Sequence, residues 1–327
     1  MTTTRRAALL ASCLALFAGP TPAQSSDTAS TYPNKPIRII VPWPAGGSVD
    51  GITRTLAVRL TASLGQQVVV DNRVGASGNI GAAAGAKAAP DGYTLLIATT
   101  PMVISASLQK NLTFNVGTDF APVSLITIVP NVLVVGPSGP ASVKELVAQA
   151  KVAPGAVKYA SSGSGTQLHL VGEAFKRSSG ADIVHVPYKG GPPALTDLMG
   201  GHVQMMFPGV PAVLPFLKSH QVKPLAVTSS KRLPLLPDVP TMAEAGFPDV
   251  EAADWYGVVA PAGTPKEIVM RLNAEIVKAI GTASVHEDLL AKGFLPTTST
   301  PERFATLMET DRKKWAAVIK QSGVTPD

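Results

Sequence analysis

Cysteine is nearly absent from this sequence, because Cys13 is the only one among 327 residues. A single thiol cannot form an intramolecular disulfide, and it cannot complete a cysteine-based zinc site. The histidines do not replace it, since no two of them have the four-residue spacing of a metalloprotease helix; they are His169, His185, His202, His220 and His286. The sequence therefore predicts neither a metal site nor a cofactor.

Charge is also scarce. Charged residues make up 15% of the chain and hydrophobic residues 45%, which is enough apolar material for a sizeable core. The formal net charge of +6 is mild and no run of five basic residues occurs, so we expect no nucleic-acid partner. The longest apolar stretch beyond the N-terminus, 125–135, is interrupted by Pro130 and Asn131, so we expect no membrane-spanning helix there.

Sequence motifs of several enzyme classes are missing as well. In SSGSGTQLHL, Leu168 occupies the third glycine position of the dinucleotide fingerprint, and no phosphate-binding GxxxxGK[ST] occurs. Around Ser77, Asn79 stands where a nucleophile elbow has its last glycine. These absences argue against an enzyme but leave one alternative open, a hydrolase or lyase in which Ser161 works with His169.

The N-terminus has the layout of a secretory signal. Arg5 and Arg6 precede an apolar run of 12 residues, 7–18, which is too short to span a membrane stably. Small residues at 21–23 then offer a cleavage site. We therefore expect a signal peptide over residues 1–23 and a mature chain in the periplasm, with a net charge of +4 and no cysteine.

Two other interpretations of this segment stay open. Leu10-Ala11-Ser12-Cys13 resembles a lipoprotein box, although only four apolar residues separate it from the arginines. Thr4-Arg5-Arg6 resembles part of a twin-arginine signal.

Beyond the N-terminus, short β-rich runs alternate with helical patterns. This alternation is typical of an α/β fold with largely parallel sheets. We expect strands at 37–41, 67–71, 93–98, 123–135, 156–160, 183–187, 203–207, 223–228 and 255–260. We expect helices at 50–64, 78–88, 142–152, 166–178, 193–199, 265–280, 285–291 and 301–320.

Three segments share one design, in which a strand leads through a turn of small residues into a helix. They are VPWPAGGSVDGITR at 41–54, LLIATTPMVIS at 95–105 and VKYASSGSGTQLHLVGEAF at 157–175. Such turns expose the first backbone N–H groups of a helix, whose dipole adds partial positive charge. The expected ligand is an anion such as a carboxylate, provided that the fold brings the turns face to face. For one turn alone, ordinary helix capping is the better explanation of the pattern.

The chain resembles a known family at a series of motifs that occur in the family's order over residues 33–323. The motifs are PAGGSVDGITR, VVVDNRVGASGNIGAAAGAKAAPDGYTLLIATT, YASSGSGTQLHL, VPYKGGPPALTDLMGGHVQMMF, PTMAEAGF and WYGVVAPAGTP. They resemble the Bug-type (TctC-like) substrate-binding proteins of tripartite tricarboxylate transporters. The resemblance implies a type II-like, two-lobed periplasmic binding protein, in which each lobe is a mostly parallel sheet flanked by helices. The ligand of such a protein lies between hinged lobes.

The resemblance also implies where the lobes divide. We expect lobe 1 to comprise residues 24–128 plus 250–327, and lobe 2 to comprise residues 129–249. The expected crossings between them are SLITIVPNV and DVEAADWYG.

Carried over residue by residue, the resemblance implies two walls of a ligand site. The first lobe would contribute the 44–50 turn and two threonines, that is Pro44, Ala45, Gly46, Gly47, Ser48, Asp50, Thr99 and Thr100. The second lobe would bind another carboxylate through Ser161, Thr166 and backbone N–H groups near Gly165 and Gln167. Tyr188 and the turn Phe207-Pro208-Gly209 would shape the depth of the pocket, whereas Arg54 and Arg73 are expected to form ion pairs only.

The ligand itself stays open between several small carboxylates. If Asp254 faces the cleft, it would accept an ammonium group and favour an acidic amino acid. If it points outward, a plain di- or tricarboxylate is expected. An aromatic carboxylate is a third possibility, because Trp255, Tyr188 and Phe207 would offer flat walls.

The resemblance implies a solute receptor, not an enzyme. Such a receptor would bind a small carboxylate and deliver it to the membrane subunits of a tripartite tricarboxylate transporter. We further expect a monomer and leave a membrane sensor kinase open as a second partner.

Overall fold

The computed structural model describes residues 31–109 and 111–325. The expected signal peptide, with Cys13, lies outside the described residues. The chain divides into two units, Met1–Tyr32 and Pro33–Asp327, and the architecture below is that of the second.

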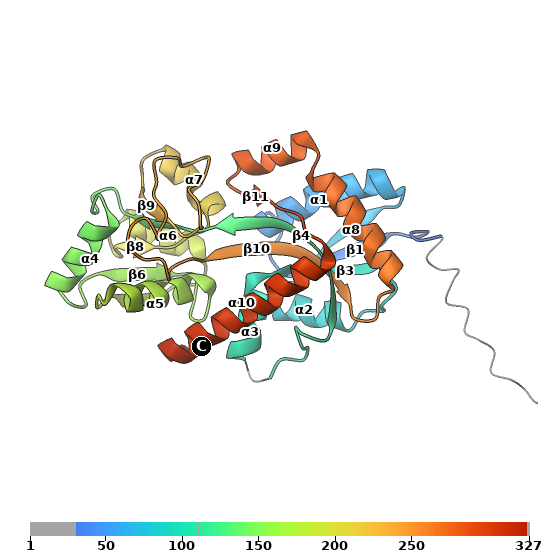
Figure 1. Cartoon of the computed structure of the whole chain (residues 1–327), viewed down its shortest axis with the longest axis horizontal. Helices are drawn as coiled ribbons and strands as arrows, with labels where there is room; N and C mark the ends of the chain where they lie inside the picture. The colour runs from blue at the N-terminus through green and yellow to red at the C-terminus, as the bar shows by residue number, and fades with distance from the viewer. Residues whose placement is uncertain (1–30, 110, 326–327) are drawn as a thin grey trace, which may run out of the picture. The chain divides into compact units, whose positions relative to one another are not determined.

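The first sheet has six strands in the order β11-β4-β10-β3-β1-β2 (Figure 1). Its parallel part is β2-β1-β3, whereas β10, β4 and β11 join it through antiparallel pairs. Four of the five β1 residues are buried, which requires cover on both faces of the sheet. The strands are β1 (Ile37–Val41), β2 (Val68–Asn72), β3 (Thr94–Thr99), β4 (Phe120–Pro130), β10 (Ala253–Pro261) and β11 (Leu295–Pro296).

The second sheet has five strands in the order β7-β6-β8-β5-β9. Strand β6 pairs in parallel with β7 and β8, and β5 pairs antiparallel with β8 and β9. The strands are β5 (Val132–Val135), β6 (Lys158–Ser161), β7 (Val184–Pro187), β8 (Met205–Met206) and β9 (Lys223–Val227). Each sheet thus contains a parallel trio and an antiparallel remainder.

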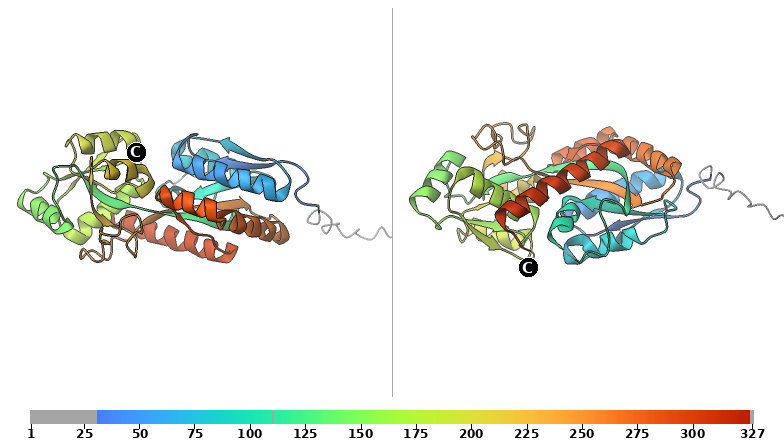
Figure 2. Two further views of the ribbon diagram at one scale, coloured as in Figure 1. Left: turned by 90° about the horizontal axis from the view of Figure 1, so that it is seen from above. Right: turned by 60° about the horizontal axis from the view of Figure 1, so that its bottom comes forward.

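The helices pack around these sheets, and α10 reaches across from the first to the second (Figures 1 and 2). It contacts α3 and β4, and its other end contacts α5 of the second half. Among the described residues no helix is both long and apolar enough to cross a membrane. The helices are α1 (Ser48–Leu64), α2 (Asn79–Ala86), α3 (Thr100–Leu108), α4 (Val143–Val152), α5 (Gln167–Ser179), α6 (Gly191–Met199), α7 (Val210–Lys218), α8 (Lys266–Ile280), α9 (Ala283–Ala291) and α10 (Pro301–Ser322), with a short 3₁₀ turn at Ala76–Gly78.

Two long strands carry the chain between the sheets. Strand β4 ends at Pro130, and β5 of the other sheet begins at Val132, so Asn131 alone separates them. On the return, β10 pairs with β4 from its first residue, with Ala253 opposite Pro130. The carboxyl ends of β1 and β3 therefore lie on the edge of their sheet from which the chain crosses over.

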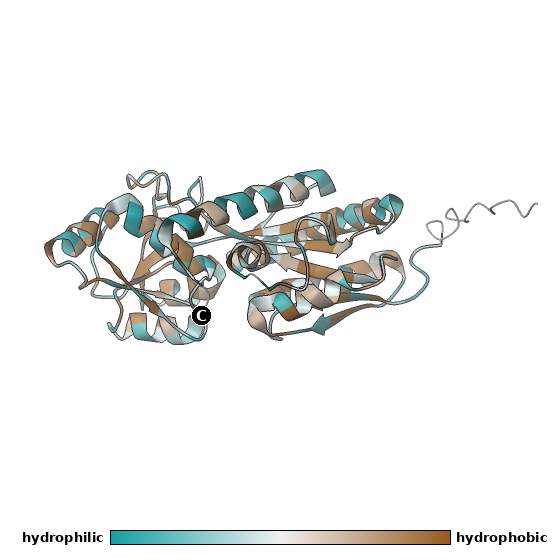
Figure 3. Ribbon diagram, turned by 90° about the horizontal axis from the view of Figure 1, so that it is seen from below, coloured by the Kyte–Doolittle hydropathy of each residue, from teal (hydrophilic) through white to brown (hydrophobic). Residues whose placement is uncertain are grey.

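The hydropathy of the chain follows this layering. Figure 3 shows both sheets coloured as hydrophobic, with polar residues gathered on outer helix faces. The largest fully buried side chains are mostly aromatic and include Trp255, Trp315, Tyr159, Phe207 and Phe304. They pack in the core, where apolar burial contributes about 25 cal/mol per Å² to stability.

The observed elements correct several expected ones. The expected strand 123–135 is two strands of different sheets, because Asn131 breaks the run where the chain changes sheet. Helix α7 was not expected, because Pro211 and Pro215 obscure its pattern, and β11 has only two residues. The predicted helix start at Thr166 is confirmed, and α1 ends at Gly65 in the left-handed conformation.

Candidate functional site

The turn before α1 is exposed from Pro44 to Ser48. It is fixed from behind by Asp50, whose carboxylate accepts the Gly46 N–H at 2.8 Å. This is the geometry of a capping box, in which an acidic side chain in the first helical turn reaches back to a backbone N–H. Gly46 has φ of +81°, a conformation that suits glycine. The turn therefore presents backbone groups outward on a rigid base.

Asp50 itself is 2% exposed and is surrounded by donors. Arg54 donates to it at 2.8 Å and the Asn72 amide at 2.9 Å. The hydrogen bond from Arg54, partly opposed by burial and aided by Gly46 and Asn72, lowers the pKa of Asp50 to about 2. Asp50 thus supports the turn, and Arg54 forms the expected ion pair, as Arg73 does with Asp71.

The start of α3 lies beside this turn, at the carboxyl end of β3. Thr99 and Thr100 are 2% and 0% exposed, and both hydroxyls have protein partners. The Trp43 indole donates to Thr99 at 3.3 Å, and the Trp255 N–H donates to Thr100 at 3.0 Å. The two threonines therefore tie the first turn, α3 and the crossing strand β10 together.

Asp254 is a half-buried carboxyl on β10, next to Thr100. Its Oδ1 atom is buried and has no hydrogen-bond partner among the described residues. Burial raises the pKa of Asp254 to about 7, against a hydrogen bond with Thr100 that lowers it, and the Asp311 charge raises it further. A carboxyl left this incompletely satisfied is the kind of group that binding sites retain.

Trp255 lies on the opposite face of β10. Its ring packs edge-on against Phe304 of α10 at 5.4 Å, and its Nε1 donates to Asp311 at 2.6 Å. Tyr256 points to the same side as Asp254, since alternate residues of a strand share a face, and its ring contacts Phe294. The expectation that Trp255 forms a flat pocket wall is therefore wrong for this arrangement, because 1% of Trp255 is exposed.

The turn before α5 is more enclosed than the turn before α1. The Thr166 hydroxyl donates to the Gly163 carbonyl at 2.7 Å, and Gly163 N–H donates to the Ser161 hydroxyl at 3.2 Å. Gly165 has φ of +71° and packs so closely on Leu108 of α3 that an added Cβ would lie 2.6 Å from its Cδ1. The start of α5 in one half therefore abuts the end of α3 in the other.

The enzyme alternative expected Ser161 to pair with His169, but the two side chains do not form a hydrogen bond with each other in the structure. The Ser161 hydroxyl lies 2.7 Å from Nε2 of His185, while Nδ1 of His169 accepts the Gly165 N–H at 3.0 Å. The two imidazole rings stack, with centroids 3.7 Å apart and planes 8° apart. Sequence reasoning missed His185, because the contact depends on the parallel register that sets Tyr159 beside His185.

Gln167 begins α5 and is 1% exposed. Neither its amide oxygen nor its amide nitrogen has a hydrogen-bond partner among the described residues. An amide with both ends buried and unsatisfied is unusual, because each lost partner costs about 1–3 kcal/mol.

The remaining predicted residues surround the carboxyl ends of β7 and β8. The Tyr188 hydroxyl donates to Asp197 at 2.6 Å, and burial, with Asp197, raises the pKa of Tyr188 to about 12. The Phe207 ring is fully buried against Phe175, so it offers no flat wall to a ligand. Its carbonyl accepts from the Asn131 amide at 3.0 Å, which holds the turn Phe207-Pro208-Gly209 at the crossing point.

One cavity of about 590 Å³ brings part of the predicted set together with the other half of the molecule. Gly46 and Gly47 line it from the turn before α1 and Ser48 from the first residue of that helix, and α7 lines it with Pro211, Leu214, Pro215 and Lys218. Phe294, which contacts Tyr256, lines it as well. Thr99, Thr100, Ser161, Gly165 and Asp254 are not among its lining residues.

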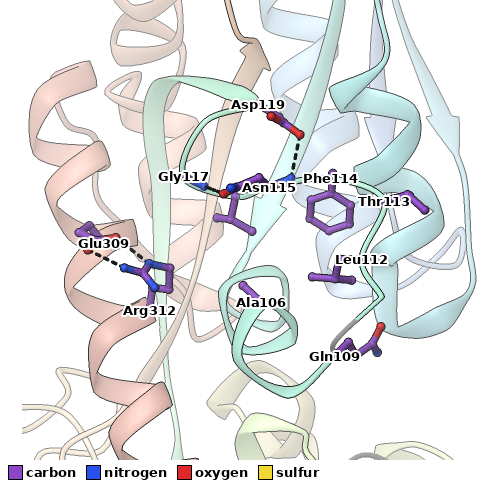
Figure 4. A pocket seen from close by; sticks show the side chains of 11 residues that line it. Ala106, Gln109, Leu112, Thr113, Phe114, Asn115, Gly117, Asp119, Glu309 and Arg312 are labelled. Atoms are coloured by element: carbon purple, nitrogen blue, oxygen red, sulfur yellow. Dashed lines mark hydrogen bonds and ion pairs between the residues drawn. The ribbon is translucent and has the colours of Figure 1, made fainter.

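A second hollow of about 760 Å³ lies between the 109–119 loop and α10 (Figure 4). Its polar groups are already paired, since Arg312 forms two hydrogen bonds to Glu309 and Asp119 accepts the Asn115 N–H. It contains none of the predicted ligand residues. In the described part of the chain, no three acidic, histidine or cysteine side chains are grouped as metal ligands would be.

Comparisons with known proteins complete this picture. A family model described as "Tripartite tricarboxylate transporter family receptor" matches residues 52–324. The chain is 42% identical over 299 residues to Protein BugT of Bordetella pertussis, covering 90% of this chain and 92% of BugT.

Two solved structures share the fold closely. R. palustris Rpa4515 with adipate has a TM-score of 0.81 and 39% identity, covering 90% of this chain and all of that one. The periplasmic binding protein BugD has a TM-score of 0.78 and 34% identity, with 90% and 100% covered. These similarities confirm the two-lobed periplasmic binding fold expected from the sequence.

Proposed function

Because the chain belongs to the tripartite tricarboxylate transporter receptor family, we propose that it binds a small dicarboxylate between its two lobes and delivers it to a membrane transporter of that class. The family consists of solute-binding receptors, and this chain is accordingly a receptor and not an enzyme. We propose that residues 1–23 are a signal peptide that directs the protein to the periplasm.

The proposal rests on one arrangement above all. Three helices, α1, α3 and α5, begin at strand ends near the crossing point, and each start follows a turn of small or hydroxylated residues. Helix starts carry unpaired N–H groups and partial positive charge, so they suit carboxylates. Two starts belong to the first sheet and one to the second, which matches a ligand with two carboxylates.

We propose the lobe boundaries expected from the sequence, with lobe 1 at 24–128 plus 250–327 and lobe 2 at 129–249. The division of the strands between two sheets supports them. All strands of the first sheet except the ends of the crossings fall in lobe 1, and β5 to β9 fall in lobe 2. We infer that these two crossings, at Asn131 and at the first residue of β10, form the hinge of the receptor.

A dicarboxylate is favoured over the other ligand classes by three observations. Rpa4515, at 39% identity, was solved with adipate. The rings of Trp255 and Phe207 are buried in the core, which leaves an aromatic ligand without the expected walls. With a pKa near 7, Asp254 is largely protonated in mild acid, and a protonated carboxyl donates to a carboxylate where an ionised one repels it.

The first test is a thermal-shift screen against dicarboxylates of increasing length, with adipate as the reference probe. A ligand at 100 times its dissociation constant adds about 2.7 kcal/mol of stability. We expect a shift for at least one dicarboxylate, reduced in Ser161→Ala and unchanged in Ser178→Ala, a matched serine near the other end of α5. No shift with any mono-, di- or tricarboxylate would refute carboxylate binding.

The pH dependence of binding then separates the ligand classes. The affinity for a dicarboxylate is expected to rise as the pH falls from 8 to 6, because Asp254 takes up a proton and ceases to repel the ligand. Asp254→Asn should flatten this dependence. An affinity that rises toward pH 8, and only for ligands with an ammonium group, would replace the dicarboxylate by an acidic amino acid.

The proposal also includes predictions about the oligomeric state and about a second partner. A monomer is expected, and sedimentation of the mature chain with and without ligand measures it. Docking on a sensor kinase is a second use of the liganded form, and uptake assays in cells lacking the transporter subunits distinguish it from delivery.

A further inference from the structure

Two stacked histidines lie directly behind the turn before α5. His169 comes from α5 and is 8% exposed, while His185 comes from β7. Their rings lie 3.7 Å apart and nearly parallel, and each reaches a different residue of the turn. His169 contacts Gly165, and His185 contacts Ser161.

The contact of His169 fixes the state of its ring. A backbone N–H can only donate, so the Gly165 N–H at 3.0 Å requires a lone pair on Nδ1 of His169. The ring hydrogen must then sit on Nε2, which lies 3.9 Å from the Glu173 carboxylate. Protonation of Nδ1 would replace this hydrogen bond by two facing hydrogens.

The contact with His185 determines which hydrogen bonds the Ser161 hydroxyl can donate and accept. A hydroxyl has one hydrogen to donate and two lone pairs to accept with. Gly163 N–H occupies one lone pair at 3.2 Å, and His185 Nε2 lies at 2.7 Å. If Nε2 of His185 carries a hydrogen, that N–H donates to the second lone pair of the Ser161 hydroxyl. Ser161 can then donate its own hydrogen to the Gly163 carbonyl at 3.0 Å or to a bound ligand.

The close stacking of the pair disfavours a positive charge on both rings at once. Tyr159 lies 5.0 Å from the His185 ring and is fully buried, and its hydroxyl donates to Glu173. Burial and Glu173 raise the pKa of Tyr159, so it stays uncharged. Glu173 is thus the charged side chain that faces the stack, and two cationic rings at 3.7 Å would repel each other strongly.

We propose that His169 and His185 are positioning residues that hold the 161–166 turn in shape through their Nε2–H tautomers, and that His185 thereby aims the Ser161 hydrogen at the bound carboxylate. The last step rests on the proposed function. The first does not, because the tautomers and the shape of the turn exist without a ligand.

The ligand-free test is a long-range ¹⁵N–¹H spectrum of the protein labelled in histidine, recorded at pH 7. We expect the Nε2–H tautomer for both rings, and the signals of the exposed His202, His220 and His286 serve for comparison. His169→Asn and His185→Gln assign the signals. A hydrogen on Nδ1 of His169, or a bare Nε2 on His185, would overturn the proposal.

The Gly165 amide reports the shape of the turn. Its proton shift should follow the titration of His169 in the wild type and stop depending on pH in His169→Asn, whose amide oxygen takes the place of Nδ1 as an acceptor. His169→Phe has no acceptor, so the Gly165 shift should move toward its acid-limit value at every pH. An unchanged Gly165 shift in His169→Phe would show that the ring does not hold the turn.

The binding arm uses adipate as the probe. His185→Phe should weaken binding about 5- to 10-fold, and His185→Gln, which keeps a donor near Nε2, should restore most of it. In a Ser161→Ala background the same replacement should have no effect, because the hydroxyl through which it acts is gone. An equal loss of affinity in both backgrounds would overturn the role of His185. If the wild type shows the expected tautomers but does not bind adipate, the result counts against adipate as the ligand and still supports the positioning of the turn.

Discussion

The turns before α1 and α5 present helix starts in a similar way, but they are held by different chemistry. The first is held by a charged carboxylate, Asp50, which Arg54 and Asn72 surround. The second is held by two neutral imidazoles, His169 and His185. The first turn is exposed, and in the second Ser161 and Gly165 are buried.

The difference separates a fixed support from an adjustable one. Asp50 has a pKa of about 2, so its hydrogen bonds persist across the neutral and mildly acidic range. The second turn depends instead on the tautomer of an imidazole, because a hydrogen on Nδ1 of His169 would remove the acceptor of the Gly165 N–H.

The largest expected effect comes from Asp254, the carboxyl on β10 beside Thr100. Its pKa is raised from 3.8 to about 7, so the folded state holds the proton more tightly than the unfolded chain. Wild-type stability should therefore fall as the pH rises from about 4 to 7 and then level off. Asp254→Asn should exceed the wild type by about 4 kcal/mol at pH 8 and by little at pH 4. Urea unfolding at both pH values measures this, and a constant difference would refute it.

Asp50→Ala should destabilise the protein by about 3 kcal/mol, because it leaves the Gly46 N–H and the Asn72 amide without their acceptor. The wild-type contribution is present above pH 4 and is lost as the pH falls toward 2, since the folded pKa is depressed. Urea unfolding at pH 7 measures the loss. Asp71→Asn, in a half-exposed ion pair with Arg73, is the control and should cost under about 1 kcal/mol.

Replacing one glycine in each turn compares their surroundings directly. Gly46→Ala has open space but a φ of +81°, so it should cost about 1 kcal/mol. Gly165→Ala has a similar φ of +71° and must also displace Leu108, so about 2 kcal/mol is expected. Thermal unfolding of both variants gives the difference, and equal losses would mean that the second turn is not packed against α3.

The smallest effect is expected at Arg54. Its side chain is 52% exposed, so its ion pair with Asp50 is screened by water and salt. Arg54→Gln should lower the free energy of unfolding only slightly, and less at high salt, while Gly46 and Asn72 still hold the carboxylate. A loss as large as that of Asp50→Ala would make the arginine, and not the backbone contact, the support of the first turn.

Local signals in the sequence predicted the helix starts well. Gly46, Gly47 and Thr166 lie where predicted, because turn and capping preferences act within a few residues. The sheet change at Asn131 was not predictable, since its neighbours on both sides read as one apolar run. It depends on contacts with Phe207, 76 residues away.

The candidate site likewise contains a part that the sequence predicted and a part that it did not. The residue types of the turns were predicted, but their supports were not, because His185 reaches Ser161 only through the register of β6 and β7. The sequence left the face of Trp255 open, since alternation along a strand does not say which face meets α10, and the structure packs Trp255 against α10. Short-range patterns therefore located the turns, and long-range packing decided how each is held.

The measurement that tests the account most directly is a map of backbone amide shifts during titration with the carboxylate that the stability screen selects. The account predicts that the amides of Gly46 and Gly47 and those of Gly165 and Gln167 shift together, along one saturation curve with one dissociation constant. Shifts confined to one of the two turns, or to neither, would contradict a carboxylate held between both lobes.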